Sequence, residues 1–208
     1  MTGRLVQLQI PPWEEHELEQ IAAKGFAALN VRDEDDLARR LAKESFGSPH
    51  LMQDFCLELC KENGIRESQR DENKLNAPSE WTSFFAARAS EAEKAAFDRL
   101  ARGPRQRKDR KVRPFRTGGH GDIYEAVLKA IASTGPQTSL TYEEIRSALR
   151  DVLSDEVPQS YEVTRVLDEM TKIARQDIEG EPVVDWDVDL RTLYISDPFF
   201  AFFLRWGI

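Results

Sequence analysis

The sequence predicts a mainly α-helical chain with two domains: a helical bundle with one N-terminal strand, and a winged helix-turn-helix with a small β-hairpin wing. Three observations lead to this prediction. Apolar residues recur at helical spacing in both halves of the chain, two short β-like runs follow the last long helix, and a strongly basic segment separates two acidic blocks. We therefore expect domains at residues 1–100 and 119–208, joined by a basic linker at residues 101–118.

The first domain begins with a strand pattern and continues as helices. In residues 5–10, apolar side chains alternate with glutamines and two prolines follow, which favours a strand that ends there. An unpaired strand edge seeks another strand, so this run is also a candidate for self-association. Apolar spacing and caps predict helices over residues 13–24, 33–46, 49–62 and 79–100. The polar residues 65–78 are expected to be loose.

Three helices and a hairpin are expected in the second domain. Thr141 and Glu144 form a capping box for the middle helix. The expected helices span residues 122–132, 141–153 and 160–176, and the β-like runs span residues 182–189 and 191–197. This order is typical of a winged helix-turn-helix. The apolar tail, residues 197–208, should pack as a final core helix, with an exposed docking surface as the alternative.

Composition limits the functions open to this protein. Its net charge of -8 and its pI near 5.1 argue against a surface that coats nucleic acid or anionic lipid along its whole length. The sequence has no apolar stretch of the ~18 to 20 residues needed to span a bilayer, and its first residues lack the apolar run of a signal peptide. We therefore expect a cytoplasmic protein.

No residue set has the spacing of a catalytic or metal site. His50, Cys56 and Cys60 match no common zinc pattern, and the two cysteines do not suggest the disulfide framework of a secreted domain. We expect these cysteines to be buried packing residues. No Cys/His or Ser/His/Asp set has a spacing that indicates catalysis, so we expect neither catalytic residues nor a bound metal.

Three stretches of the chain carry a resemblance to a known group of proteins. They are VQLQIPPWEEHEL at residues 6–18, FGSPHLMQDFC at residues 46–56 and LYISDPFFAFFLRW at residues 193–206. Together they resemble the C-terminal half, helical lid plus winged helix, of AAA+ and STAND-type P-loop ATPases. The resemblance implies that Gly47 and Pro49 touch the adenine of ATP or ADP. It also implies that His50 holds a phosphate-sensing position, where arginine is common in AAA+ proteins.

The phosphate-cradling motif of these ATPases is missing from the sequence. None of the eleven glycines begins a G-x-x-x-x-G-K-[ST], and no hydrophobic strand ends in the paired acids that hold Mg²⁺. A lid without such a loop contributes little affinity for phosphates, so we expect no hydrolysis and no cofactor held by this chain alone. The leading hypothesis is a regulatory lid and winged helix that senses nucleotide in a separate or missing P-loop core and docks a protein partner. A fragment, an internal-start product and a separate subunit all stay open.

The alternative function is nucleic-acid binding. Residues 99–118 carry nine basic side chains and one acidic side chain, a density suited to sequence-independent contact with phosphates. The third helix of the winged helix adds an exposed tyrosine and arginine, but acids on this helix and on the wing oppose DNA readout. A linker held against its acidic neighbours also stays open. The candidate nucleic-acid residues are Arg102, Arg105, Arg107, Lys108, Arg110, Lys111, Arg113, Arg116, Tyr161 and Arg165.

Overall fold

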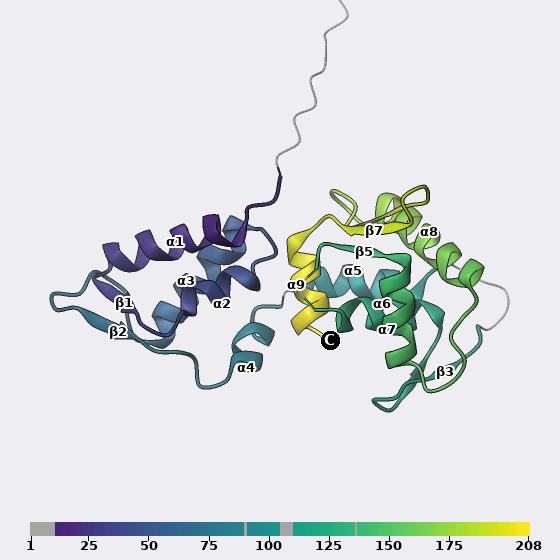
Figure 1. The fold of residues 1–208 in the computed structure, drawn as a ribbon, viewed down its shortest axis with the longest axis horizontal. Coiled ribbons are helices and arrows are strands. Elements are labelled where there is room, and N and C mark those ends of the chain that lie inside the picture. The colour runs from purple at the N-terminus through teal and green to yellow at the C-terminus, as the bar shows by residue number, and fades with distance from the viewer. Residues whose placement is uncertain (1–10, 90, 105–109, 136) are drawn as a thin grey trace, which may run out of the picture. The chain divides into compact units, whose positions relative to one another are not determined.

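The computed structural model describes residues 11–89, 91–104, 110–135 and 137–208 (Figure 1). The chain divides into two compact units, an N-terminal unit up to Ala77 and a C-terminal unit from Pro78 onward. Helices dominate both units and small sheets complete them, which confirms the predicted mainly α-helical class. Among the described residues, no helix is long and apolar enough to cross a membrane. The strand expected at residues 5–10, and self-association through it, lie outside the described residues.

In its described residues, the N-terminal unit is a bundle of three helices with one pair of strands. Its elements are α1 (Glu15–Ala28), β1 (Val31–Asp33), α2 (Leu37–Lys43), α3 (Pro49–Glu62) and β2 (Asn73–Leu75). β1 and β2 are parallel, with Val31 opposite Asn73. The apolar faces of the helices meet in a core where Leu18, Met52 and Phe55 are fully buried. α3 has its predicted bounds, whereas α1 continues past the predicted end at residue 24 and α2 covers only part of the predicted range 33–46. β2 lies in the segment expected to be loose.

Side-chain caps fix where α2 and α3 begin. The Asp33 carboxylate accepts hydrogen bonds from the amides of Leu37 at 3.0 Å and Ala38 at 2.8 Å, so it caps α2 from four residues away. At α3, the Ser48 hydroxyl accepts a hydrogen bond from a first-turn amide at 3.3 Å, and Pro49 occupies the first helical position. Ser48 is therefore the N-cap of α3, as predicted, whereas the N-cap residue of α2 is Asp36 and Asp33 caps the helix from outside it.

The C-terminal unit holds the remaining described elements. It opens with α4 (Trp81–Ala86), α5 (Glu91–Arg102), β3 (Arg113–Pro114) and β4 (His120–Gly121). Then come α6 (Ile123–Ser133), β5 (Ser139–Thr141), α7 (Tyr142–Val152), α8 (Ser160–Gln176), β6 (Val184–Asp187), β7 (Thr192–Ile195) and α9 (Pro198–Trp206). β3 and β4 form a short antiparallel pair.

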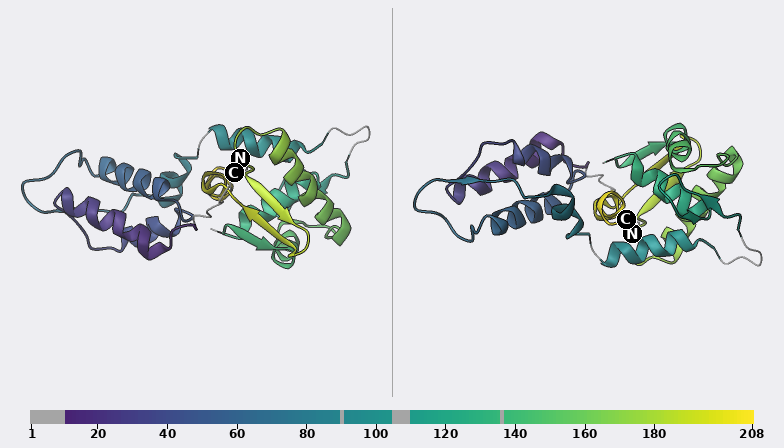
Figure 2. Two further views of the ribbon diagram at one scale, coloured as in Figure 1. Left: turned by 90° about the horizontal axis from the view of Figure 1, so that it is seen from above. Right: turned by 90° about the horizontal axis from the view of Figure 1, so that it is seen from below.

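The order from α6 to β7 is that of a winged helix-turn-helix. Within the described residues, β5, β6 and β7 form one antiparallel sheet in which β7 lies between the other two strands (Figure 2). α8 packs beside β6, and the Trp186 amide donates a 2.8 Å hydrogen bond to the Thr171 hydroxyl, which joins helix to wing. The predicted three helices and hairpin are confirmed. β5 was not predicted, because Leu140 is its one apolar residue.

The boundary between the units lies earlier in the chain than the charge pattern suggested. Residues 78–100, expected in the first domain, belong to the C-terminal unit, as do the described parts of the expected linker, residues 101–104 and 110–118. The single helix expected over residues 79–100 is two helices, α4 and α5. α5 packs against α6, α8 and α9, and the rings of Phe97 and Phe203 lie 5.8 Å apart. The apolar contacts of α5 therefore override the charge contrast that marked a linker.

The C-terminal tail is part of the core. On α9, Phe200 and Phe202 are fully buried. The Phe85 ring lies 6.1 Å from the ring of Phe202 and 4.9 Å from that of Trp206. The predicted final core helix is therefore confirmed, and its aromatic face is covered by the unit rather than exposed for docking.

Candidate functional site

The first candidate site is the turn that joins α2 to α3, residues 45–50, which we call the Gly47 turn. Phe46 and Gly47 both adopt left-handed backbone conformations, with φ of 49° and 72°. A positive φ is uncommon for a residue such as phenylalanine, so this turn departs from ordinary helix-to-helix geometry. The structure places Gly47, Pro49 and His50 together at the start of α3, and the His50 side chain is exposed.

The segment just before α1 packs against the Gly47 turn. The Trp13 amide donates a 3.0 Å hydrogen bond to the Gly47 carbonyl. A Cβ atom at Gly47 would lie 2.6 Å from the Cβ of Pro12, closer than side chains approach one another. Both the positive φ and this close approach therefore require glycine at position 47.

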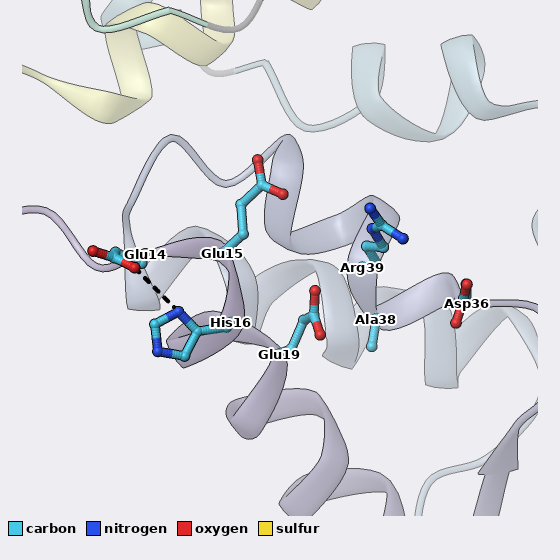
Figure 3. Close-up of a pocket in the computed structure, with 7 residues that line it drawn as sticks. All are labelled: Glu14, Glu15, His16, Glu19, Asp36, Ala38 and Arg39. Atoms are coloured by element: carbon cyan, nitrogen blue, oxygen red, sulfur yellow. Dashed lines mark ion pairs between the residues drawn. The ribbon is translucent and has the colours of Figure 1, made fainter.

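An open acidic depression lies between α1 and α2, beside this segment (Figure 3). It has a volume of about 520 Å³ and is lined by Glu14, Glu15, His16, Glu19, Asp36, Ala38 and Arg39. The His16 Nδ1 lies 3.2 Å from the Glu14 carboxylate. Carboxylates outnumber basic groups in this lining, and the resulting negative potential opposes binding of phosphates.

The second candidate site is a cleft of about 280 Å³ at the start of α8 in the C-terminal unit. Five of the predicted nucleic-acid residues meet here, three from residues 110–113 and two from α8. The lining consists of Arg110, Lys111, Arg113, Ile123, Tyr124, Tyr161, Glu162, Arg165 and Val166. The fold thus gathers basic residues that are far apart in the sequence, and we call this site the basic cleft.

The other predicted nucleic-acid residues do not line this cleft. Arg102 lines a separate open depression with Phe97 and His120. The Arg116 Nε donates a 3.1 Å hydrogen bond to the Arg150 carbonyl. Arg105, Arg107 and Lys108 lie outside the described residues. The described basic residues therefore form one cleft and scattered neighbours rather than a continuous basic stripe.

Arg110 is held by neighbours within its own unit. Its Nη1 donates to the Arg102 carbonyl at 2.8 Å and to the Asp122 carboxylate. Its Nη2 donates to the Pro104 carbonyl at 2.6 Å, and its guanidinium lies over the Tyr124 ring, 4.4 Å from the centroid. These charge-assisted and cation–π contacts fix the segment against α6, so Arg110 has a structural role.

Arg113 is the most deeply buried basic residue of the cleft, with 4% of its surface exposed. Its Nη1 donates to the Glu156 carbonyl at 3.2 Å, and its Nη2 lies 3.7 Å from the Glu162 carboxylate. Its Nε has no hydrogen-bond partner in the described part of the chain. These contacts join residues 110–113 to the start of α8, and the Glu162 carboxylate offsets the charge of this guanidinium.

Three side chains of the cleft reach solvent. Tyr161 is 70% exposed. Arg165 is exposed and makes no hydrogen bond or ion pair with the residues that the structure describes. The Lys111 side chain is 63% exposed, with its Nζ 3.9 Å from the Asp155 carboxylate. These three side chains can contact a ligand without a change in the fold.

Beyond the cleft, the basic residues of α8 are paired with acids. The Lys172 Nζ lies 2.8 Å from Glu169 and 3.1 Å from Asp168, and the hydrogen bond to Glu169 raises the pKa of Lys172. The Arg175 Nη2 lies 2.7 Å from the Asp185 carboxylate on β6. The C-terminal half of α8 therefore presents no excess of positive charge to a polyanion.

On α3, Cys60 is buried, as expected, whereas Cys56 is only half-buried. Burial, followed by the nearby Cys60 and Asp33, raises the pKa of Cys56 to about 12. Burial also raises the pKa of Cys60, and both thiols are free. Among the described residues, no three His, Cys, Asp or Glu side chains are grouped to hold a metal ion.

We expect both thiols to react slowly in the folded protein. At about pH 8, Cys56 should react with a disulfide reagent roughly 30-fold more slowly in the folded chain than in urea. The raised pKa makes the thiolate scarce in the folded chain, and the higher nucleophilicity of that thiolate offsets only part of the loss. The raised pKa also stabilises the fold fully below pH 9, and this contribution is lost between about pH 9 and 12. Labelling of the folded chain at the denatured rate would contradict this expectation.

The order and pairing of the elements define the C-terminal unit as a winged helix-turn-helix, and the N-terminal unit as a small helical module with a left-handed turn before α3. Comparisons with protein-family models, with curated proteins and with solved structures gave no match to this chain. Its function is therefore inferred from the chemistry and placement of its own residues.

Proposed function

We propose that this chain is the regulatory lid and winged-helix portion of a P-loop ATPase. The N-terminal unit closes on ATP or ADP held by a core outside this sequence, and the C-terminal unit relays that state to a protein partner. The chain has no catalytic role in this proposal, because its sequence contains no phosphate-cradling loop. The packing of the Pro12–Trp13 segment on Gly47 is the observation that carries the proposal.

This packing couples the Gly47 turn to the chain that leads into α1. The hydrogen bond from Trp13 and the close approach of Pro12 leave the segment little room to move unless the turn moves with it. In the proposal, the ATPase core contacts the Pro12–Trp13 segment. The turn and the core therefore shift together when nucleotide binds or leaves.

Apart from His50, the N-terminal unit is suited to contact the base rather than the phosphates. Gly47 and Pro49 offer the adenine a backbone and a ring edge, and His50 extends from the first turn of α3. The acidic depression beside α1 repels phosphates. The proposal therefore assigns the cradling of the phosphates to the core, base contact to Gly47 and Pro49, and phosphate sensing to His50.

The tip of the wing is suited to a protein partner. Val188 and Leu190, in the turn between β6 and β7, are each 64% exposed. Asp187 and Asp189 alternate with them, so the tip combines apolar and acidic groups. Such a surface complements an apolar protein patch with a basic rim and repels nucleic acid. We assign partner docking to this tip.

Titration with ATP and ADP tests the proposal. The chain alone should bind neither nucleotide at micromolar strength and should not hydrolyse ATP. The tagged chain should retain a P-loop ATPase core encoded by a neighbouring gene. Retention should be at least about 5-fold stronger with one nucleotide than with the other, because 5-fold is the lower end of the usual coupling between two binding sites. ATP turnover by the purified chain, or retention that ignores nucleotide, would rule the proposal out.

His50→Ala examines the sensing position in the same retention assay. Because the His50 side chain is exposed, its removal should cost little stability while it reduces the difference between ATP and ADP several-fold. Lys61→Ala is the control, since Lys61 lies at the other end of α3 in an exposed pair with Glu58. Equal behaviour of the two variants would remove His50 from the proposal.

A further inference from the structure

We propose that the basic cleft binds single-stranded nucleic acid, with the Tyr161 ring stacked on a base and with Lys111 and Arg165 on the flanking phosphates. These side chains come from two segments that the fold brings together, residues 110–113 and the first turns of α8. The site does not depend on the proposed ATPase role, because all of its residues belong to the C-terminal unit.

Internal ion pairs fix the walls of the cleft. Arg110 pairs with Asp122, and Arg113 faces Glu162, the one acid among the described residues of the lining. The Glu162 carboxylate also accepts a 2.8 Å hydrogen bond from the Gln159 amide, which holds this carboxylate at the start of α8. The walls are therefore organised, with their charges balanced, before a ligand arrives.

The positive charge that no acid of the cleft neutralises lies at its rim. Arg165 has no ion pair in the described part of the chain, and the Lys111 Nζ lies 3.9 Å from Asp155, at the far limit of an ion pair. Behind them, Arg113 is buried and its charge is already paired with Glu162, so the unneutralised charge belongs to the rim. A chain of phosphates is the ligand that such a rim attracts.

The Tyr161 ring supplies an aromatic platform beside these cations. Tyr161 is 70% exposed at the second position of α8. Arg165 follows four residues later, so the two side chains share one face of the helix. Exposed aromatic rings next to basic side chains bind single strands because every nucleobase has a face that stacks.

The surroundings of the cleft favour a single strand over a duplex. A recognition helix in a major groove brings several of its turns close to phosphates. One turn beyond Arg165, α8 carries Asp168 and Glu169. The wing adds Asp187 and Asp189, and all four acids repel a duplex backbone. A single strand that crosses the cleft at the first turns of α8 does not have to follow the helix to these acids.

Fluorescence anisotropy of a labelled oligothymidylate of about ten nucleotides, measured with the full chain, tests the proposal. Binding should weaken as salt rises from about 50 to 200 mM, because neutralised phosphates release counterions. Tyr161→Ala should weaken binding about 5- to 150-fold through the loss of stacking. Tyr161→Phe should keep the wild-type affinity, since the ring is retained.

Arg165→Ala and Lys111→Ala should act through charge. Each should lower the steepness of log K against log salt by about 0.7, the value for one phosphate of a single strand. Lys172→Ala is the matched control, because it removes the same charge from the same helix where Asp168 and Glu169 already neutralise it. Its affinity and salt slope should stay close to those of the wild type.

Wild-type affinity in both Tyr161→Ala and Arg165→Ala would overturn the proposal, and so would tighter binding to a duplex of the same length. Loss of binding only on replacement of Arg105, Arg107 and Lys108 would also overturn it, since the proposal assigns those residues no contact. None of these outcomes changes the nucleotide-dependent retention of an ATPase core. The two proposals therefore fail separately.

Discussion

Replacing Phe202 by alanine should lower the free energy of unfolding of the C-terminal unit by about 3 to 5 kcal/mol. Phe202 is fully buried on α9, and its ring meets the Phe85 ring edge-on at 6.1 Å. α9 packs against α4, α5 and α6, so truncation leaves a cavity that several helices would have to close. Denaturant-dependent amide exchange of the full chain measures the loss in α5 and α9, with α1 and α3 as the internal reference.

Phe199→Ala is the control for this prediction. Phe199 lies on the same helix and is only half-buried, so its truncation should cost about 1 kcal/mol. Phe202→Leu keeps most of the volume and should cost less than Phe202→Ala. Equal losses in the two alanine variants would show that α9 is not anchored as a core helix.

The helices predicted from the sequence are those in which caps and apolar spacing agree. The capping box at α7 is present, with the Thr141 amide hydrogen-bonded to the Glu144 carboxylate at 2.7 Å. α8 follows its apolar stripe over Ser160–Gln176, as predicted. Local rules suffice for such helices, because each rule involves only residues within one or two turns.

The short strands depend on contacts that a local pattern does not contain. β1 and β2 have three residues each. They pair with each other although α2 and α3 separate them in the chain. β5 contributes Leu140 alone to the core. Alternation cannot be recognised in three residues, and their pairing is set by distant partners. The unit boundary at Pro78 was missed for the same reason, since α5 packs on helices that come later in the chain.

The candidate sites show the same difference between features set by local sequence and features set by distant contacts. The turn at Gly47 was predicted because glycine and the proline after it have strong local conformational preferences. Tyr161 and Arg165 were predicted as exposed from helical spacing alone. The burial of Arg113 was not predicted, because a high density of charge normally indicates a solvated segment. The contact between Arg113 and Glu162 joins segments that are far apart in the chain, and the sequence pattern does not contain it. The basic cleft was therefore visible only once the fold was known.

Replacing Gly47 by valine should lower the free energy of unfolding of the N-terminal unit by about 2 to 4 kcal/mol. The φ of 72° at this position is unfavourable for a β-branched residue, and the new Cβ would lie 2.6 Å from the Cβ of Pro12. To relieve that overlap, Pro12 and Trp13 must move away from the turn. This movement breaks the 3.0 Å hydrogen bond from Trp13, so faster exchange of the Trp13 amide reports the effect.

Two other glycines separate the conformational part of this loss from the steric part. Gly64 has the same φ of 72° but no atom within 4 Å of a new Cβ, so Gly64→Ala should cost only about 1 to 2 kcal/mol. Gly25 lies in open space on α1, and Gly25→Ala should stabilise the unit by about 0.5 to 1 kcal/mol. Gly47→Ala should cost more than Gly64→Ala and should also speed exchange of the Trp13 amide. If the two variants cost the same, Pro12 does not constrain the Gly47 turn, and the coupling required for nucleotide sensing is absent.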